Sequence, residues 1–179
     1  RKQIFSDGAY SMYSINYNRF ILHVYLLALR LGDLNNQPFS EDLRRAVAAS
    51  VDHLAQLIDP HTGQMPEYGS IDGALVLPLN NCDYTDYRPI LQLGAFITRG
   101  VRLVPPGPWD EDLLWLCGAQ SLEAPLQQPQ QQDSAFPDGG IYTLHGSASR
   151  VVVRCASHRE RPSHADQLHL DLSWQGQPI

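Results

Sequence analysis

The chain has 179 residues, of which 43% are hydrophobic and 18% charged, and its formal net charge is −6 with a sequence pI near 5.5. This composition is typical of a globular protein and excludes a disordered chain. The acidic balance argues against a nucleic-acid-binding surface, which would need a basic patch. The longest apolar run, residues 20–31, contains His23 and Arg30 and is too short to cross a bilayer.

The N-terminal part of the sequence predicts four helices. Residues 9–31 are apolar around most of the expected helical circumference, which suits a buried helix that ends at Gly32. Ser40 is a favourable N-cap and is followed by an acidic first turn, so a second helix should begin there. The predicted helices cover residues 9–31, 41–58, 86–98 and 109–117.

Two groups of polar residues in this helical part are candidates for function. Asn16, Asn18 and Arg19 fall in the first half of a helix that is otherwise apolar. Buried amides must be hydrogen-bonded or line a wet cleft, and the sequence leaves both interpretations open. Residues 64–73 form a glycine-rich loop that carries Tyr68, and such loops often hold functional groups on a rigid scaffold.

From residue 119 onward the composition and the hydrophobic period change. Residues 119–138 include a glutamine run and are predicted to be a surface linker. Period-2 alternation beyond it predicts strands at residues 141–145, 151–155 and 167–174. Helices followed by strands indicate an α+β protein, with a helical part at 1–118, the linker at 119–138 and a β domain at 139–179. These strands are too few to close a sandwich, so we expect a piece of a longer protein.

Two histidines and two carboxylates lie close together at and just before the last predicted strand. His164 and Asp166 precede it, and alternation places His169 and Asp171 on one face with Leu168, Leu170 and Leu172 on the other. The apolar face can pack against the protein, while the polar face presents imidazole and carboxylate to a cleft or a metal. A half-buried strand with a solvated polar face is the alternative interpretation.

Four stretches of the sequence occur in an order that is informative as a set. They are residues 14–20, 66–74, 136–142 and 163–167, the last of which reads Ser-His-Ala-Asp-Gln. They resemble the helix motif, the tyrosine loop, and the entry and His-Ala-Asp strand of the β domain in the heparinase II/III-like polysaccharide lyases. The resemblance implies the C-terminal helices of an α/α-toroid followed by the first strands of an antiparallel β-sandwich.

The resemblance also implies β-elimination on an acidic polysaccharide that contains uronic acid. A proton must leave C5, next to the uronate carboxylate, and the enolate that forms must be stabilised by hydrogen-bond donors. Asn16 and Asn18 are the candidate donors, and Tyr68 is the candidate base and acid if nearby cations lower its phenol pKa. The predicted substrate contacts are Arg19, Arg88, Asp72 and His164.

Two positions depart from the family pattern. Asn18 stands where many relatives carry histidine, and Pro162 stands where many carry a catalytic histidine. Tyr68 therefore acts alone as base and acid, or His158 or His145 substitutes, or the protein is not a lyase. A catalytically degenerate glycan-binding or polysaccharide-biosynthesis accessory protein is the second hypothesis.

No cofactor is required by the lyase hypothesis, but a structural zinc at His164 and Asp166 is possible by resemblance to some relatives. Zinc needs further ligands, which would come from His169, Asp171 or residues beyond Ile179. A metal-dependent hydrolase built on His164, Asp166 and His169 is the third hypothesis. The resemblance favours a periplasmic or cell-envelope location, and it implies that the missing N- and C-terminal parts of the same protein pack against this segment.

Overall fold

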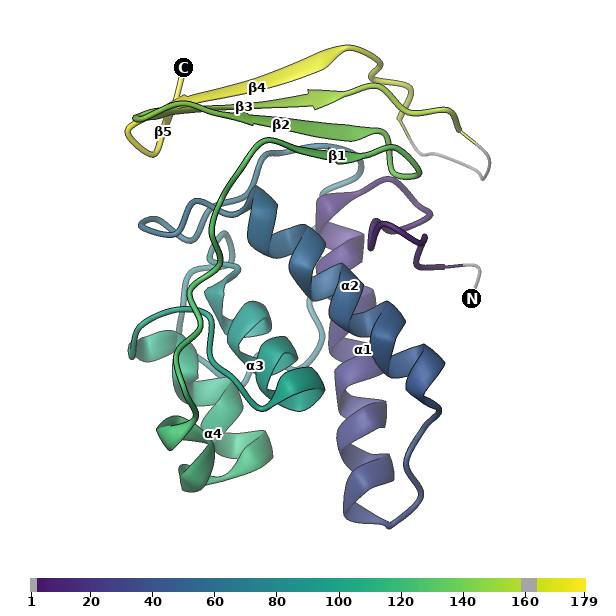
Figure 1. The fold of residues 1–179 in the computed structure, drawn as a ribbon, viewed down its shortest axis with the longest axis vertical. Coiled ribbons are helices and arrows are strands. Elements are labelled where there is room, and N and C mark those ends of the chain that lie inside the picture. Colours follow the sequence, from purple (N-terminus) through teal and green to yellow (C-terminus); the bar gives the residue numbers. More distant parts are fainter. Residues whose placement is uncertain (1–2, 159–163) are drawn as a thin grey trace.

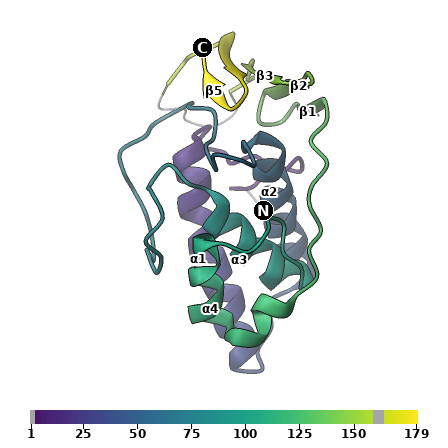
Figure 2. The ribbon, with the colours of Figure 1, turned by 90° about the vertical axis from the view of Figure 1, so that its left-hand side faces the viewer.

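The computed structural model describes residues 3–158 and 164–179, and it consists of a helical layer beneath an antiparallel sheet (Figure 1). Turned by 90°, the sheet is seen nearly end-on above the helices (Figure 2). Its α-helices are α1 (Ile15–Leu34), α2 (Glu41–Leu57), α3 (Arg88–Arg99) and α4 (Glu111–Cys117). Its strands are β1 (Ser134–Phe136), β2 (Ile141–His145), β3 (Ser149–Arg154), β4 (His169–Trp174) and β5 (Gln177–Pro178). The predicted α+β class is confirmed.

Helix α1 begins later than predicted. Tyr13 adopts a left-handed backbone with φ 55°, and Ser14 then caps the helix by accepting a hydrogen bond from the Tyr17 amide at 3.1 Å. The predicted start at residue 9 is therefore wrong, because the apolar residues before Ser14 pack in a turn. The helix also continues past Gly32 to Leu34.

The other helices follow their predicted caps closely. Ser40 caps α2 as predicted, and its hydroxyl accepts from the Leu43 amide. Proline occupies the first turn of α3, and Gly100 ends that helix in the left-handed region at φ 69°. Trp109 lies in a 3₁₀ turn, Pro108–Asp110, so α4 begins two positions later than predicted, at Glu111. No helix among residues 3–158 and 164–179 is long and apolar enough to span a membrane.

The predicted linker at 119–138 contains regular structure at both ends. A 3₁₀ helix, Ala119–Glu123, is held by the Ser121 hydroxyl, which donates to the Gly118 carbonyl at 2.6 Å. At the other end, β1 pairs with β2 in the register Ser134 to Thr143. The glutamine run therefore bridges a shorter stretch than predicted, and Gln56 of α2 donates to the Gln130 carbonyl at 3.1 Å.

The sheet has the order β1-β2-β3-β4-β5, and its antiparallel register gives two distinct faces. Arg154 pairs with both Ile141 and His169, so these three side chains share the inner face, toward the helices. The outer face carries an apolar set that is half-buried or exposed: Tyr142, Leu144, Val151, Val153, Leu170, Leu172 and Trp174.

Strand β4 turns its polar side to the protein, contrary to the expectation that its leucine face packs. Leu168 is 71% exposed and Leu170 is 63% exposed. Leu168 also has a left-handed backbone at φ 57°, so the strand begins at His169 and not at Gln167. The reason is the register, which places His169 opposite the inward-facing Arg154.

Candidate functional site

The loop that carries Tyr68 is fixed to the start of α1. The Ile15 amide donates to the Tyr68 carbonyl at 3.2 Å, and the Ser14 hydroxyl donates to the Ser70 carbonyl at 2.7 Å. Gly69 has φ +72°, and a Cβ there would lie 2.3 Å from the Tyr13 carbonyl oxygen. Only glycine permits this close approach, so the position of the loop depends on Gly69.

The Tyr68 side chain is buried, with 7% of its surface exposed. Burial raises the pKa of the phenol, and the guanidinium of Arg154 opposes that rise. The Arg154 guanidinium carbon lies 5.7 Å from the centroid of the tyrosine ring. The cation that the sequence hypothesis required near Tyr68 is therefore present, although burial has the larger effect on the pKa.

The His-Ala-Asp segment meets the tyrosine loop through the same arginine. Arg154 forms an ion pair with Asp166, and its Nη2 donates to the His164 carbonyl at 3.4 Å. Burial raises the pKa of Asp166, but its own backbone amide, the Arg154 charge and the nearby Gly69 amide together lower it overall. The His164 side chain is exposed, and Pro162 lies outside the described residues. The predicted residues Tyr68, His164 and Asp166 are thus brought together.

Asn16 lies in a separate polar network beside this junction. Its Oδ1 accepts from the Tyr84 hydroxyl at 2.5 Å and from Arg19 Nη2 at 3.0 Å, and its Nδ2 donates to Asp72 Oδ1 at 3.3 Å. The Tyr17 hydroxyl donates to the other oxygen of Asp72 at 2.5 Å. The amide of Asn16 therefore has partners at both ends, and Asp72 is one of them.

Arg19 is buried within the same network. Its guanidinium lies between the rings of Tyr84 and Tyr87, at 4.3 Å and 4.2 Å from their centroids, and 3% of the residue is exposed. The guanidinium of Arg19 thus stacks on two aromatic rings and donates a hydrogen bond to Asn16. Arg19 is therefore placed to hold Asn16 and the segment around Tyr84.

Asn18 points away from Asn16, toward α2. Its Oδ1 accepts from the Ser50 hydroxyl at 2.8 Å, and the residue is fully buried. Positions two apart on a helix lie on different sides of it, because each residue turns the chain by about 100°. Nδ2 of Asn18 has no hydrogen-bond partner within residues 3–158 and 164–179. The two asparagines that the sequence grouped as enolate donors are thus in different environments.

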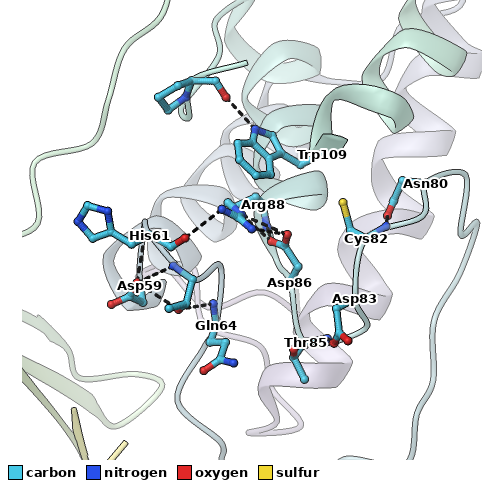
Figure 3. A network of polar contacts seen from close by, with 12 residues as sticks. Asp59, His61, Gln64, Asn80, Cys82, Asp83, Thr85, Asp86, Arg88 and Trp109 are labelled. Carbon is cyan, nitrogen blue, oxygen red and sulfur yellow. Dashed lines mark hydrogen bonds and ion pairs between the residues drawn. The ribbon is translucent and has the colours of Figure 1, made fainter. Parts of the chain in front are cut away.

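Arg88, the first residue of α3, belongs to a different network of polar contacts (Figure 3). It forms a two-pronged ion pair with Asp86, its Nη1 donates to the His61 carbonyl at 3.1 Å, and its guanidinium stacks on Trp109 at 3.8 Å from the ring centroid. These contacts tie the turn after α2 to the start of α3. None of these contacts is with Tyr68.

A cavity of about 520 Å³ opens between the tyrosine loop, the segment around Tyr84 and strand β4. Its polar lining includes Glu67, Arg150, His169 and Asp171, and the Glu67 amide donates to Asp171 Oδ2 at 3.4 Å. The polar face of β4 therefore faces a cleft, as the alternation predicted. A volume of this size is within the range of small-molecule and sugar-sized sites, about 300–1,000 Å³.

A metal site is not supported by the side chains that the structure describes. Among them, no group of three or more histidine, cysteine, aspartate or glutamate residues could hold a metal ion. Asp166, one predicted ligand, is paired with Arg154. The zinc site at His164 and Asp166 stays a prediction.

Sequence reasoning missed Arg154 and Tyr84. Arg154 could have been found, because alternation along residues 151–155 places it on the same face as Val152, and an inward arginine next to a His-Ala-Asp stretch needs a partner. Tyr84 gives no comparable signal. It lies in an irregular segment, and only the folded chain shows that its hydroxyl reaches Asn16.

The fold and the junction define a class: an α+β protein in which an antiparallel sheet sits on helices and a polar cleft lies between them. Residues 128–179 match the family model described as Heparinase II/III-like, C-terminal. The match agrees with the resemblance that the sequence motifs indicated, and it makes residues 128–179 similar to the C-terminal region of that family.

A solved structure has the same fold over nearly the whole chain. It is a mutant of the heparan sulfate lyase HepC from Pedobacter heparinus, with a TM-score of 0.62 and 15% sequence identity. The match covers 99% of this chain and 26% of that one, so the chain spans about a quarter of the length of this similar structure. No curated protein matches the chain.

Proposed function

We propose that this chain is part of a polysaccharide lyase that cleaves a uronic-acid-containing polysaccharide by β-elimination. The observation that carries the proposal is the junction in which Arg154 joins the tyrosine loop to the His-Ala-Asp segment. This junction lies in a chain whose C-terminal residues match the heparinase II/III-like family model and whose fold is that of a heparan sulfate lyase. The polar cleft beside the tyrosine loop is large enough for a sugar, although its lining includes Glu67 and Ile71 of that loop and not Tyr68.

The proposed reaction removes the C5 proton and breaks the bond between C4 and its glycosidic oxygen. Tyr68 takes the C5 proton in its deprotonated form, the electron pair enters the carboxylate as an enolate, and a double bond forms between C4 and C5 as the oxygen leaves. The protonated phenol then returns a proton to the leaving oxygen, so the atoms and charges balance. Burial opposes deprotonation of Tyr68, and the Arg154 cation favours it.

The enolate needs donors that do not compete as bases. Of the two asparagines, Asn18 has an Nδ2 without a partner among the residues that the structure describes, but it is fully buried beside Ser50 and would have to be uncovered to reach a uronate. Asn16 would have to exchange its contact with Asp72 in order to reach a uronate. His164 has an exposed side chain beside Asp166 and is the candidate for direct contact with the sugar.

One observation favours the alternative of a catalytically degenerate glycan-binding or biosynthetic accessory protein. Tyr68 is only 7% exposed, and its burial raises the phenol pKa, which is the wrong direction for a base. In that case the cleft binds sugar and no unsaturated product forms. This hypothesis and the lyase hypothesis differ in product and not in binding.

The remaining parts of the proposal concern the whole protein. The exposed apolar face of the sheet supports packing against missing parts of the same protein, because large uncovered apolar patches mark interaction surfaces. An acidic polysaccharide is the proposed partner in solution. A periplasmic or cell-envelope location is the setting in which such a substrate would be met.

The decisive experiment incubates the full-length protein with a panel of uronate polymers and follows the ultraviolet absorbance of the unsaturated product. Tyr68→Phe should lower kcat by about 10²-fold or more, because a proton-transfer group contributes roughly 10²–10⁴-fold. Tyr142→Phe is the matched control, since Tyr142 lies on the outer face of the sheet and is 37% exposed. Sugar binding by folded wild type without any unsaturated product would support the accessory protein instead. An unchanged rate in Tyr68→Phe would remove Tyr68 from the mechanism.

A further inference from the structure

Arg154 is a fully buried arginine that the sequence hypothesis did not use. It ends β3 on the inner face of the sheet, and only 1% of its surface is exposed. A buried guanidinium is costly unless ion pairs and hydrogen bonds compensate for lost water. The partners of Arg154 therefore indicate its role.

Those partners come from both segments that match the family's motifs. On one side, Arg154 pairs with Asp166 and donates to the His164 carbonyl at 3.4 Å. On the other side, its guanidinium lies 5.7 Å from the Tyr68 ring centroid, within the distance of about 6 Å at which a cation attracts an aromatic face. The Gly69 amide, next to Tyr68, also interacts with the Asp166 carboxylate and helps to lower its pKa. One arginine and one carboxylate thus link the tyrosine loop to the sheet.

We propose that Arg154 is a positioning residue for the lyase reaction, and that its pair with Asp166 latches the His-Ala-Asp segment onto the tyrosine loop so that Tyr68 is held at one place. This inference rests on the proposed function for its catalytic part. Its structural part, the latch, does not depend on any activity.

The planar arrangement of the guanidinium donors explains why arginine is needed here. A guanidinium presents several donors in one plane, so Arg154 can pair with the Asp166 carboxylate and donate to the His164 carbonyl together. A lysine at this position keeps the charge near Tyr68 but offers a single point of attachment. Methionine keeps much of the length and loses both the charge and the donors. The two substitutions therefore separate the effect of charge from the effect of geometry.

The catalytic part is tested with Arg154→Met and Arg154→Lys in the full-length protein. Arg154→Met should lower kcat by about 10²-fold with KM changed by less than about threefold, because a small displacement of a catalytic group costs about that much in rate. The limb of the pH profile on which kcat rises with pH should also move to higher pH, since removal of the cation raises the pKa of Tyr68. Arg154→Lys should keep that limb in place and recover part of kcat.

The matched control is Arg44→Met. Arg44 is a partly buried arginine that is also paired with an aspartate, Asp33, but it lies in α2 and its other hydrogen bond goes to the Ile97 carbonyl of α3. It should leave kcat and its pH profile unchanged. If Arg154→Met raises KM and leaves kcat intact, Arg154 binds substrate directly and the positioning role is wrong.

The latch itself is tested by hydrogen exchange of the Gly69 amide, which needs no enzymatic activity. In Arg154→Met this amide should exchange at least about tenfold faster than in wild type, because the Asp166 carboxylate with which it interacts loses its partner. The amide of Leu54, in the core of α2, should keep its protection. Asp166→Asn provides the same readout if Arg154→Met does not fold.

The outcomes separate the latch from the proposed function. A wild type that makes no unsaturated product but shows faster Gly69 exchange in Arg154→Met would contradict the lyase proposal and retain the latch. Unchanged Gly69 exchange in both Arg154→Met and Asp166→Asn would overturn the latch, even if kcat fell, because the loop would then be held without Arg154.

Discussion

The two faces of the sheet differ in how they bury polar and apolar side chains: the inner face buries both kinds, and the outer face leaves large apolar side chains exposed. The inner face, against the helices, buries Thr143, Arg154 and Ser173 at 1%, 1% and 7% exposure. The outer face leaves Leu144 and Leu170 at 55% and 63% exposure. The sheet is therefore attached to the helical layer by buried apolar side chains, such as Ile141 and Val152, and by hydrogen bonds, such as the one from Arg150 to the Leu57 carbonyl. Much of the apolar surface of its outer face is free for a further layer.

Gly69→Ala should cause the largest loss of stability, because it disturbs the contact between the tyrosine loop and the start of α1. An alanine Cβ would lie 2.3 Å from the Tyr13 carbonyl oxygen, and the backbone would have to hold φ +72°. Left-handed strain and steric overlap should together lower the free energy of unfolding by about 3 kcal/mol, measured by urea unfolding. Gly73→Ala is the matched control, because Gly73 has φ +80° but an alanine Cβ there would meet nothing within 4 Å, and it should lose about 1 kcal/mol. Equal losses would mean that the close approach to Tyr13 is unimportant.

Arg88→Met tests an ion pair that lies within the helical layer alone. The side chains of Arg88 and Asp86 are 15% and 8% exposed, so removal of the cation leaves a mostly buried carboxylate without its partner. We expect the free energy of unfolding to fall by about 2–3 kcal/mol, somewhat less than for a fully buried pair. Arg45→Met is the control, because its pair with Asp42 is 70% and 49% exposed and should contribute less than about 1 kcal/mol. A similar loss in both variants would contradict the importance of burial.

The parts of the fold and of the site that could be predicted are those that depend on a local pattern in the sequence. The Ser40 cap and the alternation of residues 141–145 are local patterns, and the structure confirms both elements. The ordered motifs also predicted one site from Tyr68, Asn16, Asn18, His164 and Asp166. The structure links Tyr68 to Asp166 and to the His164 carbonyl through Arg154, and the roles of these residues stay predictions.

The misses arise where contacts between distant segments decide the outcome. Asn16 and Asn18 are neighbours in sequence, but the helix turns one toward Tyr84 and the other toward Ser50. The start of α1 was missed because the apolar residues before Ser14 are consistent with either a helix or a buried turn. The direction in which β4 faces was missed because alternation gives two faces without saying which one meets the helices.

His53→Leu tests the contact between α2 and β1 through the pH dependence of the free energy of unfolding. His53 of α2 is fully buried, packs edge-on against Phe136 of β1 at 4.4 Å between ring centroids, and has no hydrogen-bond partner at either ring nitrogen among the described residues. Burial lowers its pKa from 6.5 to about 3. Below pH 6.5 the unfolded chain binds a proton that the folded chain does not, so this histidine should progressively destabilise the fold as pH falls toward 3.

The variant should therefore be more stable than wild type by about 2 kcal/mol at pH 4 and within about 1 kcal/mol of it at pH 7.5. The measurement is urea unfolding of both proteins at a series of pH values. Parallel stability curves from about pH 7.5 to about pH 4 would show that His53 is not held in its neutral form by burial.

Leu170→Ser gives the smallest effect in this chain and tests the other half of the comparison. Leu170 is 63% exposed, so its substitution here should change the free energy of unfolding by less than about 0.5 kcal/mol. In a longer protein whose additional strands cover the outer face, the same substitution should cost about 2 kcal/mol, the value of burying a leucine side chain. Ile141→Ala on the inner face is the control, because Ile141 is 1% exposed and should cost about 2–5 kcal/mol in both proteins. If Leu170→Ser has the same small effect in both, the outer face is not covered by the rest of the protein, and the apolar patch must be explained by another partner.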